Sequence, residues 1–275
     1  MNTNYYTTSD GIQIGYSDEG EGTPLLLLSG LTRNAKDFNH LVPHLTGYRV
    51  IRPDYRGRGR SDHAPYQTYT VEIEARDQLE LLDHLSLDQV AIIGTSRGGL
   101  IAMLLAAVAK HRLTGVCLND IGPEIAASGR KYIMTYLGRR PPQKSYEDAA
   151  KIRAEHFIDF PNVPMSRWLE EVQNQFTLSD RGLELMYDRK LRDAVGEGLK
   201  TTEQPDLWPL FDALDGLPLT LLRGANSNLL SEECAQGMQR RRPDMLFANI
   251  PDRGHVPFLD EAESLDVIHQ FLRMI

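Results

Sequence analysis

The chain has 275 residues, of which 41% are hydrophobic and 25% are charged, and its formal net charge is -8. This length suits one large α/β domain with an insertion or two small domains, and this composition argues against disorder. The negative charge argues against nucleic acid as a partner, and no stretch approaches the roughly 18 apolar residues of a membrane helix.

Short apolar runs alternate with helix-like segments in the first part of the chain. We expect a hairpin over residues 4–18 with Asp10-Gly11 as its turn, strands at 25–28, 48–54, 90–93 and 116–120, and helices at 34–45, 70–84 and 100–108. Asn34 would open the first of these helices. Strand and helix in alternation imply parallel crossovers. The sequence therefore predicts an α/β fold: a doubly wound, mostly parallel sheet of about eight strands whose first hairpin is antiparallel.

The alternation stops between residues 124 and 212. We expect helices over residues 130–137, 145–157, 166–176 and 183–200, no strand among them, a short helix at 206–214, and then strands at 217–223 and 245–250. This pattern predicts a core of residues 1–123 and 213–275 and a helical lid of residues 124–212 inserted between two strands. The lid aromatics face a pocket or pack between helices. They are Tyr132, Tyr136, Trp168, Phe176 and Trp208.

Ser96 lies between the strand at 90–93 and the helix at 100–108. Gly94 and Gly98 flank it in the pattern G-x-S-x-G, which is typical of a sharp turn that exposes a nucleophilic serine at the end of a sheet. The same residues also occur where a serine only caps a helix. Further residues are needed to separate the two interpretations.

A histidine supplies the general base that a serine nucleophile requires. Of the eight histidines, His255 is the one that follows a predicted strand in a loop and has a glycine, Gly254, beside it. The histidines and carboxylates show no spacing typical of metal ligands, so we expect no metal and no cofactor.

The cysteines and the first residues indicate a compartment. Cys117 and Cys234 lie in apolar segments, which suggests buried, reduced thiols. Residues 1–6 lack the basic start and apolar run of an export signal. We therefore expect a cytoplasmic protein. The oligomeric state is not indicated.

Four motifs together resemble the α/β-hydrolase fold family over essentially the whole chain. They are Leu28-Ser29-Gly30, the segment 54–61 (Asp-Tyr-Arg-Gly-Arg-Gly-Arg-Ser), the turn at 94–99 and Arg253-Gly254-His255. The resemblance implies that Ser96 is a nucleophile, that His255 is its base, and that the backbone N–H groups of Leu31 and Arg97 form an oxyanion hole. Gly30 and Val256 would then adjoin the substrate. Haloalkane dehalogenases and epoxide hydrolases resemble this fold, but they need an aspartate where Ser96 stands.

The catalytic acid is the main departure from the family pattern. The loop that should carry an aspartate has Asn228 at that place, and an amide does not stabilise an imidazolium as a carboxylate does. Three explanations remain open. Asn228 is an engineered or selected trap, or Asp120 at the end of an earlier strand replaces it, or the protein is a slow or non-catalytic relative that binds a ligand. Asp120 also suits a simple turn cap.

The resemblance implies a cofactor-free serine hydrolase of small-molecule carboxylic esters or lactones that forms an acyl-enzyme on Ser96 and is crippled by Asn228. The alternatives are a ligand-binding, non-catalytic receptor and a carbon–carbon bond hydrolase. Several arginines and a lysine near the predicted site favour an acidic acyl group, or else pair with carboxylates of the protein itself. They are Arg33, Arg97, Arg130, Lys131, Arg139 and Arg140.

Overall fold

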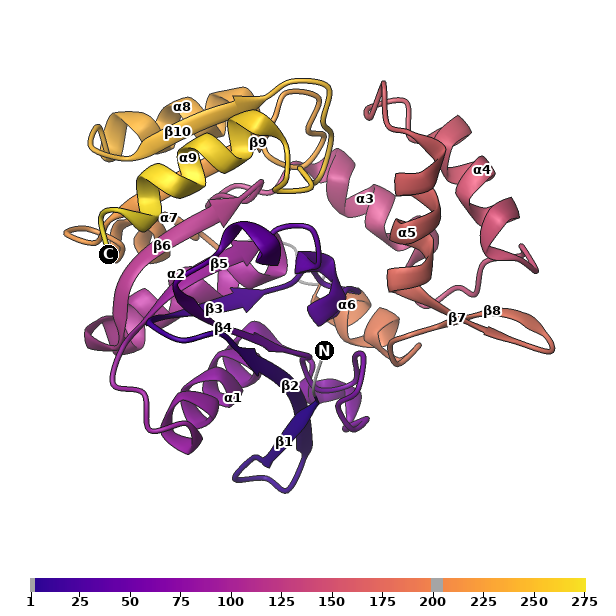
Figure 1. Ribbon diagram of the computed structural model, residues 1–275, viewed down its shortest axis with the longest axis horizontal. Coiled ribbons are helices and arrows are strands. Elements are labelled where there is room, and N and C mark those ends of the chain that lie inside the picture. Colours follow the sequence, from indigo (N-terminus) through magenta and orange to yellow (C-terminus); the bar gives the residue numbers. More distant parts are fainter. Residues whose placement is uncertain (1–2, 199–204) are drawn as a thin grey trace.

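A mixed sheet forms the centre of the computed structural model, which describes residues 3–198 and 205–275 (Figure 1). In order across the sheet, its strands are β1 (Asn4–Thr7), β2 (Gln13–Glu19), β4 (Tyr48–Pro53), β3 (Thr23–Leu28), β5 (Val90–Thr95), β6 (Leu113–Asn119), β9 (Leu219–Gly224) and β10 (Leu246–Ile250). β2 pairs antiparallel with β1 and with β4, and all other neighbours are parallel. The predicted sheet, with its antiparallel first hairpin, is confirmed.

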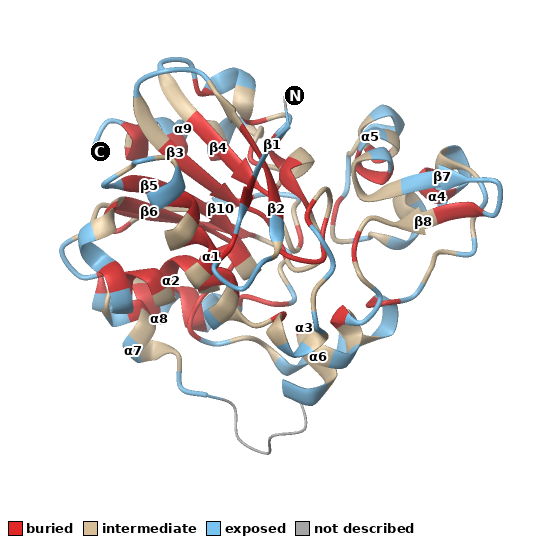
Figure 2. Ribbon diagram, turned by 90° about the horizontal axis from the view of Figure 1, so that it is seen from below, coloured by how far each residue is buried: buried red, intermediate tan, exposed pale blue. Residues whose placement is uncertain are grey.

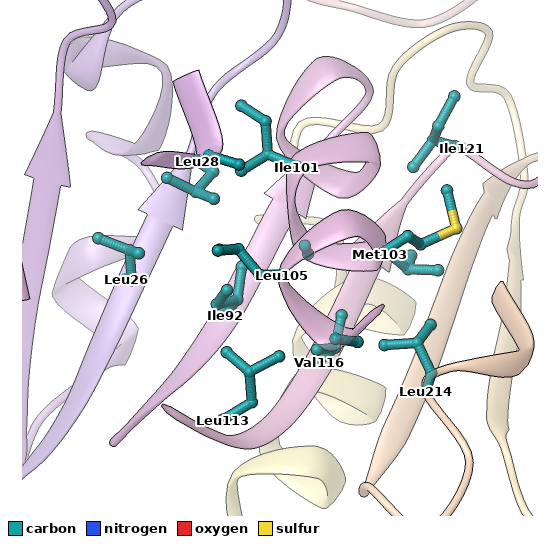
Figure 3. Packing of buried hydrophobic residues seen from close by; sticks show 14 of the residues in the cluster. Leu26, Leu28, Ile92, Ile101, Met103, Leu105, Leu113, Val116, Ile121 and Leu214 are labelled. Carbon is teal, nitrogen blue, oxygen red and sulfur yellow. The ribbon is translucent and has the colours of Figure 1, made fainter. Parts of the chain in front are cut away.

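Helices cover both faces of this sheet because its central strands are apolar on both sides. One face packs against α1 (Val71–His84), α2 (Arg97–Ala109), α7 (Trp208–Asp212) and α8 (Glu232–Arg241), and the other packs against α9 (Ala262–Leu272). Alternate residues of β3 serve the two faces: Leu26 and Leu28 lie in the first cluster, and Leu25 and Leu27 lie in the second. Figure 3 shows the first cluster, where Leu28 of β3 lies beside Ile101 of α2 and Ile92 of β5 lies beside Leu105 of α2.

The segment between β6 and α7 stands beside the sheet rather than within it (Figure 1). It contains α3 (Ala127–Tyr136), α4 (Tyr146–His156), α5 (Met165–Gln175), β7 (Phe176–Ser179), β8 (Gly182–Leu185) and α6 (Leu191–Gly198). Its own small core includes Trp168, Val172 and Leu183. In Figure 2 most of the buried residues lie in the sheet and its covering helices, with smaller groups in this segment.

The end of the predicted lid belongs to the core by packing. α7 falls within the predicted lid range of 124–212, yet its Phe211 is buried in the cluster on the first sheet face.

Two predictions about local structure are wrong. The first is the helix at 34–45, which is instead a pair of short 3₁₀ turns, η1 (Ala35–Phe38) and η2 (Val42–His44). Asn34 does cap η1 by accepting a hydrogen bond from Lys36 N. Pro43 has no N–H to donate, so an α-helix does not continue through it.

The second wrong prediction is that the inserted segment has no strand. β7 and β8 form an antiparallel hairpin, and β8 begins at Gly182, directly after the turn, with a φ of +100°. The predicted helix at 183–200 therefore begins only at Leu191, and residues 199 and 200 lie outside the described part of the chain. Alternating apolar residues in 176–185 favour a hairpin over a helix.

Short 3₁₀ turns also form at η3 (Tyr66–Thr68) and η4 (Lys110–Arg112).

Cys117 and Cys234 are free and buried, as expected. Within residues 3–198 and 205–275, no helix has the length and apolar character needed to cross a membrane.

Candidate active site

Ser96 occupies the turn between β5 and α2, at the carboxyl edge of the sheet. Its φ is +50°, a left-handed conformation that a serine seldom adopts. The turn leaves no room for side chains: a methyl group on Gly94 would come within 2.7 Å of the backbone of Gly98, and one on Gly98 would overlap the carbonyl oxygen of Leu28. The glycines of the motif are therefore required by close packing, and the serine side chain is partly accessible.

His255 reaches this serine from the loop that follows β10. Its Nε2 lies 2.9 Å from Ser96 Oγ, and its Nδ1 lies 2.7 Å from Oδ2 of Asp120. A carboxylate can only accept a hydrogen bond, so Nδ1 carries the proton and Nε2 is left to accept from the serine hydroxyl. Three side chains that are distant in sequence thus form one hydrogen-bonded chain.

Asp120 is fully buried at the end of β6, and its carboxylate is held by more than the histidine. Gly224 N donates to Oδ1 at 2.8 Å, and Ser227 Oγ donates to Oδ2 at 2.6 Å. Ser227 was not among the predicted site residues. Its hydroxyl lies in the loop after β9, where a serine gives no specific signal in the sequence.

Asn228 does not occupy the place that the family pattern assigned to it. Its backbone oxygen accepts a hydrogen bond from Ser128 Oγ, and in the described structure its side chain makes no hydrogen bond to His255. The prediction of Asn228 as the neighbour of the histidine is corrected: the carboxylate beside His255 comes from Asp120, the second position considered.

Two backbone N–H groups lie where the sequence predicts an oxyanion hole. Arg97 N begins α2 directly after Ser96, and Leu31 N follows Gly30 at the end of β3. Neither N–H has a hydrogen-bond acceptor within residues 3–198 and 205–275. A methyl group on Gly30 would lie 3.9 Å from the Cβ of Ser96, which places this loop against the nucleophile.

The side chain of Arg97 forms a buried ion pair. Its Nε donates to Glu74 of α1 at 2.7 Å, and its Nη2 donates to the backbone oxygen of Tyr69. The other carboxylate oxygen of Glu74 pairs with the fully buried Arg58 at 2.8 Å. Arg97 therefore anchors the turn and is not free to bind an acidic acyl group.

Trp168 and Trp208, two of the aromatic residues predicted to line the site, pack against other side chains of the protein. Trp168 is 3% exposed and packs against Phe157, Phe160 and Phe258, so the prediction that it contacts substrate is corrected. Trp208 packs on Phe211 and donates its indole N–H to Glu124, beside α8.

Tyr132 and Tyr136 lie together on α3. They are 48% and 42% exposed, and their ring centroids are 5.6 Å apart. Phe176 follows α5, and Val256 follows His255 and is partly exposed.

The inserted segment is tied to the core by ion pairs from α5. Glu171 accepts from Arg33 of the β3 loop at 2.8 Å, and Arg167 pairs with Asp260 at 2.7 Å. Asp37 binds Arg33 from the other side at 2.6 Å. Burial raises the pKa of Asp37 to about 6, although the Arg33 guanidinium opposes this. Arg33 is thus a structural link, not a free cation.

The remaining predicted cations lie at the edge of the insertion. Arg140 pairs with Glu184, whereas Arg130, Lys131 and Arg139 have no ion pair within the described residues. No group of three His, Cys, Asp or Glu side chains within the described residues is arranged to hold a metal ion.

Comparisons with known proteins identify the family of the chain. Residues 23–262 match the family model of the alpha/beta hydrolase fold. A 3-hydroxybutyrate-oligomer hydrolase of Cupriavidus necator is 34% identical over 260 residues, which cover 90% of this chain and 88% of that protein. A 2-(acetamidomethylene)succinate hydrolase of Mesorhizobium japonicum is 24% identical over 245 residues, which cover 89% of this chain and 85% of that protein.

A solved structure extends the similarity to the whole fold. The crystal structure of an alpha/beta hydrolase from Novosphingobium aromaticivorans is 37% identical, with a TM-score of 0.93, and the match covers 100% of this chain and 98% of that one. The chain is therefore a member of the α/β hydrolase fold family.

Proposed function

We propose that this protein hydrolyses carboxylic esters or lactones through an acyl-enzyme on Ser96, with Asp120 as the acid of its catalytic triad. The observation that carries the proposal is the hydrogen-bonded chain from Asp120 through His255 to Ser96, at 2.7 and 2.9 Å. These distances lie in the range that general-base activation of a serine requires.

Each residue has a step in the proposed mechanism. His255 Nε2 takes the proton as Ser96 Oγ attacks the ester carbonyl, and Asp120 stabilises the imidazolium that forms. The N–H groups of Leu31 and Arg97 donate to the developing oxyanion. His255 then returns the proton to the leaving alcohol, and a water molecule activated by the same imidazole releases the acid.

The position of Asp120 supports an active enzyme rather than a crippled one. The non-catalytic receptor was suggested by Asn228, and that reason disappears when a carboxylate already binds Nδ1 of His255. Of the predicted lid of residues 124–212, the described part 124–198 would act as a lid over the site, since Glu171 and Arg167 of α5 bind the core at Arg33 and Asp260.

The similarity to a 3-hydroxybutyrate-oligomer hydrolase supports esters as the substrate class. Oligomers of a hydroxy acid are joined by ester bonds, and the reaction needs no group beyond those present here. A carbon–carbon bond hydrolase would use the same three side chains, so the choice of substrate in the assay decides between the two.

The test is an activity screen with matched labelling. Purified protein should cleave short p-nitrophenyl esters or γ-butyrolactone, and Ser96 should take a fluorophosphonate label, whereas the Ser96→Ala variant should do neither. Absence of both turnover and labelling in the folded wild type would overturn the proposal. Cleavage of a ring-cleavage product, without cleavage of any ester or lactone, would assign the carbon–carbon reaction instead.

A further inference from the structure

Arg153 of α4 carries a positive charge that pairs with no carboxylate among the described residues. Its Nη2 donates to the neutral amide oxygen of Gln175 at 2.9 Å, and its guanidinium lies 5.4 Å from the ring centre of Phe157 and 5.9 Å from that of Phe176. It forms no ion pair with any carboxylate in the described parts of the chain. Arg153 is half-buried, and an arginine that is partly removed from water is usually paired with a carboxylate.

Glu171, a carboxylate close to Arg153, already binds two other arginines. Oε2 of Glu171 accepts from Arg33 at 2.8 Å and from Gln175 at 3.3 Å, and Oε1 accepts from Arg167 at 3.1 Å. Glu171 therefore serves two arginines directly and reaches Arg153 only through the amide of Gln175. Asp37 pairs with Arg33 and Asp260 pairs with Arg167, so the carboxylates of this cluster are bound to the other two arginines and none binds Arg153 directly.

The surroundings of Arg153 disfavour its charge. Burial, followed by the repulsion of Arg33, lowers the pKa of Arg153 to about 10. The guanidinium remains charged at neutral pH. A partly desolvated charge with no counter-ion costs free energy, and an incoming anion would recover part of that cost.

Tyr136 of α3 lies close enough to Arg153 to interact with it electrostatically. Tyr136 is 42% exposed, yet burial raises its pKa to about 12, with Arg33 and Arg153 opposing the shift. Tyr132 also acts electrostatically on Arg153, so the two tyrosines of α3 are neighbours of the arginine of α4.

Hydrogen bonds connect Arg153 to the loop beside the catalytic serine. Arg33, which follows the oxyanion loop, donates to Glu171, and Gln175 joins Glu171 to Arg153. A methyl group on Gly30 would lie 3.3 Å from Cγ of Arg33 and 3.9 Å from Cβ of Ser96. A path of neighbouring residues thus leads from Ser96 past Gly30 and Arg33 to Arg153.

We infer that Arg153 binds a free carboxylate of the substrate, so that the preferred substrates are esters that also carry a carboxylate group. This inference rests on the proposed ester hydrolysis at Ser96 and narrows its substrate class. The planar guanidinium suits a carboxylate because it donates two parallel hydrogen bonds. The rings of Phe157 and Phe176 hold it in place and exclude water from one side.

Two pairs of substrates, each an acid and its primary amide, isolate the charge. The linear dimer of 3-hydroxybutyrate and its terminal amide place the charge on the alcohol side of the ester. Monomethyl succinate and methyl succinamate place it on the acyl side. We expect the wild type to prefer the acid of at least one pair by about 10- to 100-fold in kcat/KM, the scale of one charge-assisted interaction.

Variants of α4 assign this preference to Arg153. Arg153→Gln should lose the preference for the acid while keeping its rate on the amide, and Arg153→Lys should retain part of it. Lys151→Gln removes the same charge from an exposed position on the same helix and should change neither rate. An equal acid-to-amide ratio in the wild type and Arg153→Gln, with esters cleaved, would overturn the inference and leave the proposed function standing.

Binding provides a readout that does not depend on turnover. Calorimetry should show that Ser96→Ala binds the 3-hydroxybutyrate dimer or monomethyl succinate at least about 10-fold more tightly than Ser96→Ala/Arg153→Gln does. Equal affinity, or no binding to Ser96→Ala, would contradict a carboxylate site. If the wild type cleaves no ester while this difference in binding persists, the proposed function fails and the site at Arg153 remains.

Discussion

Replacing Asp120 by asparagine should greatly lower kcat without unfolding the protein. The side chain keeps its shape, so the consequence depends on which way the new amide points. Gly224 N can only donate, and it faces Oδ1 of Asp120 at 2.8 Å. The amide oxygen must therefore occupy the Oδ1 position, and the NH₂ group must take the place of Oδ2, facing His255 Nδ1 and Ser227 Oγ.

This orientation forces the wrong tautomer on the histidine. An NH₂ group donates to Nδ1, so the ring proton moves to Nε2, which then cannot accept a proton from Ser96. In a serine protease the corresponding exchange lowers kcat by about 10⁴. The same loss here corresponds to about 5 kcal/mol of transition-state stabilisation, since each tenfold step is about 1.4 kcal/mol.

The assay compares kcat on a short p-nitrophenyl ester for the wild type, Asp120→Asn, Asn228→Asp and the double variant. We expect Asn228→Asp to stay within about threefold of the wild type and the double variant to be as slow as Asp120→Asn, because a carboxylate at residue 228 has no contact with the ring. Circular dichroism and thermal unfolding control for folding. If Asp120→Asn keeps a tenth of the wild-type kcat, or if the double variant recovers it, the assignment of the acid is refuted.

Three further predictions concern stability, each measured by urea unfolding. Gly98→Ala should cost at least about 2 kcal/mol, since its methyl group would overlap the Leu28 carbonyl, whereas Gly196→Ala, on an open helical position, should gain up to about 1 kcal/mol; a small loss for Gly98→Ala would show that the turn can widen. Glu74→Gln should cost about 3–5 kcal/mol by leaving Arg58 and Arg97 without a counter-charge, and a neutral result would mean that water reaches them. Because the pKa of Asp37 is raised to about 6 in the folded state, the folded protein holds an extra proton above pH 4, and its stability falls as the pH rises from about 4 to about 6. Asp37→Asn should remove that part of the slope, and identical slopes in the two proteins would disprove the shift.

Much of the fold could be predicted because the strands are short, apolar and separated by turn residues. Leu25–Leu28 and Val90–Ile93 are buried on both faces of the sheet, as a continuous apolar run in a parallel sheet should be. The helix predicted at 34–45 does not form, because Pro43 interrupts a pattern that otherwise has helical periodicity. The β7–β8 hairpin was missed because its strands have only four residues each, too few for the alternation of apolar residues to stand out.

The site could be predicted as far as local sequence determines it. Ser96 and His255 each lie in a turn that follows a strand, and those turns have their own signals in Gly94, Gly98 and Gly254. The choice between Asp120 and Asn228 depends on which side chain faces a ring 135 residues further along the chain from Asp120, and spacing carries no information about that. Arg153 was overlooked for a similar reason: the absence of a counter-ion is a property of the folded surroundings, not of the helix that bears it.

The sheet itself explains how the acid can sit on either of two strands. β6 and β9 are parallel neighbours, with Asn119 opposite Leu222, and Asp120 N donates to Leu222 O at 2.8 Å. The residues that follow the two strands therefore start side by side at one edge, and both lie within one side-chain length of the loop that carries His255. Gly224 N and Ser227 Oγ, which come from the β9 side, bind the carboxylate that comes from β6. The loop after β9 thus has a function even without supplying an acid: its donors hold the Asp120 carboxylate in place beside Nδ1 of His255.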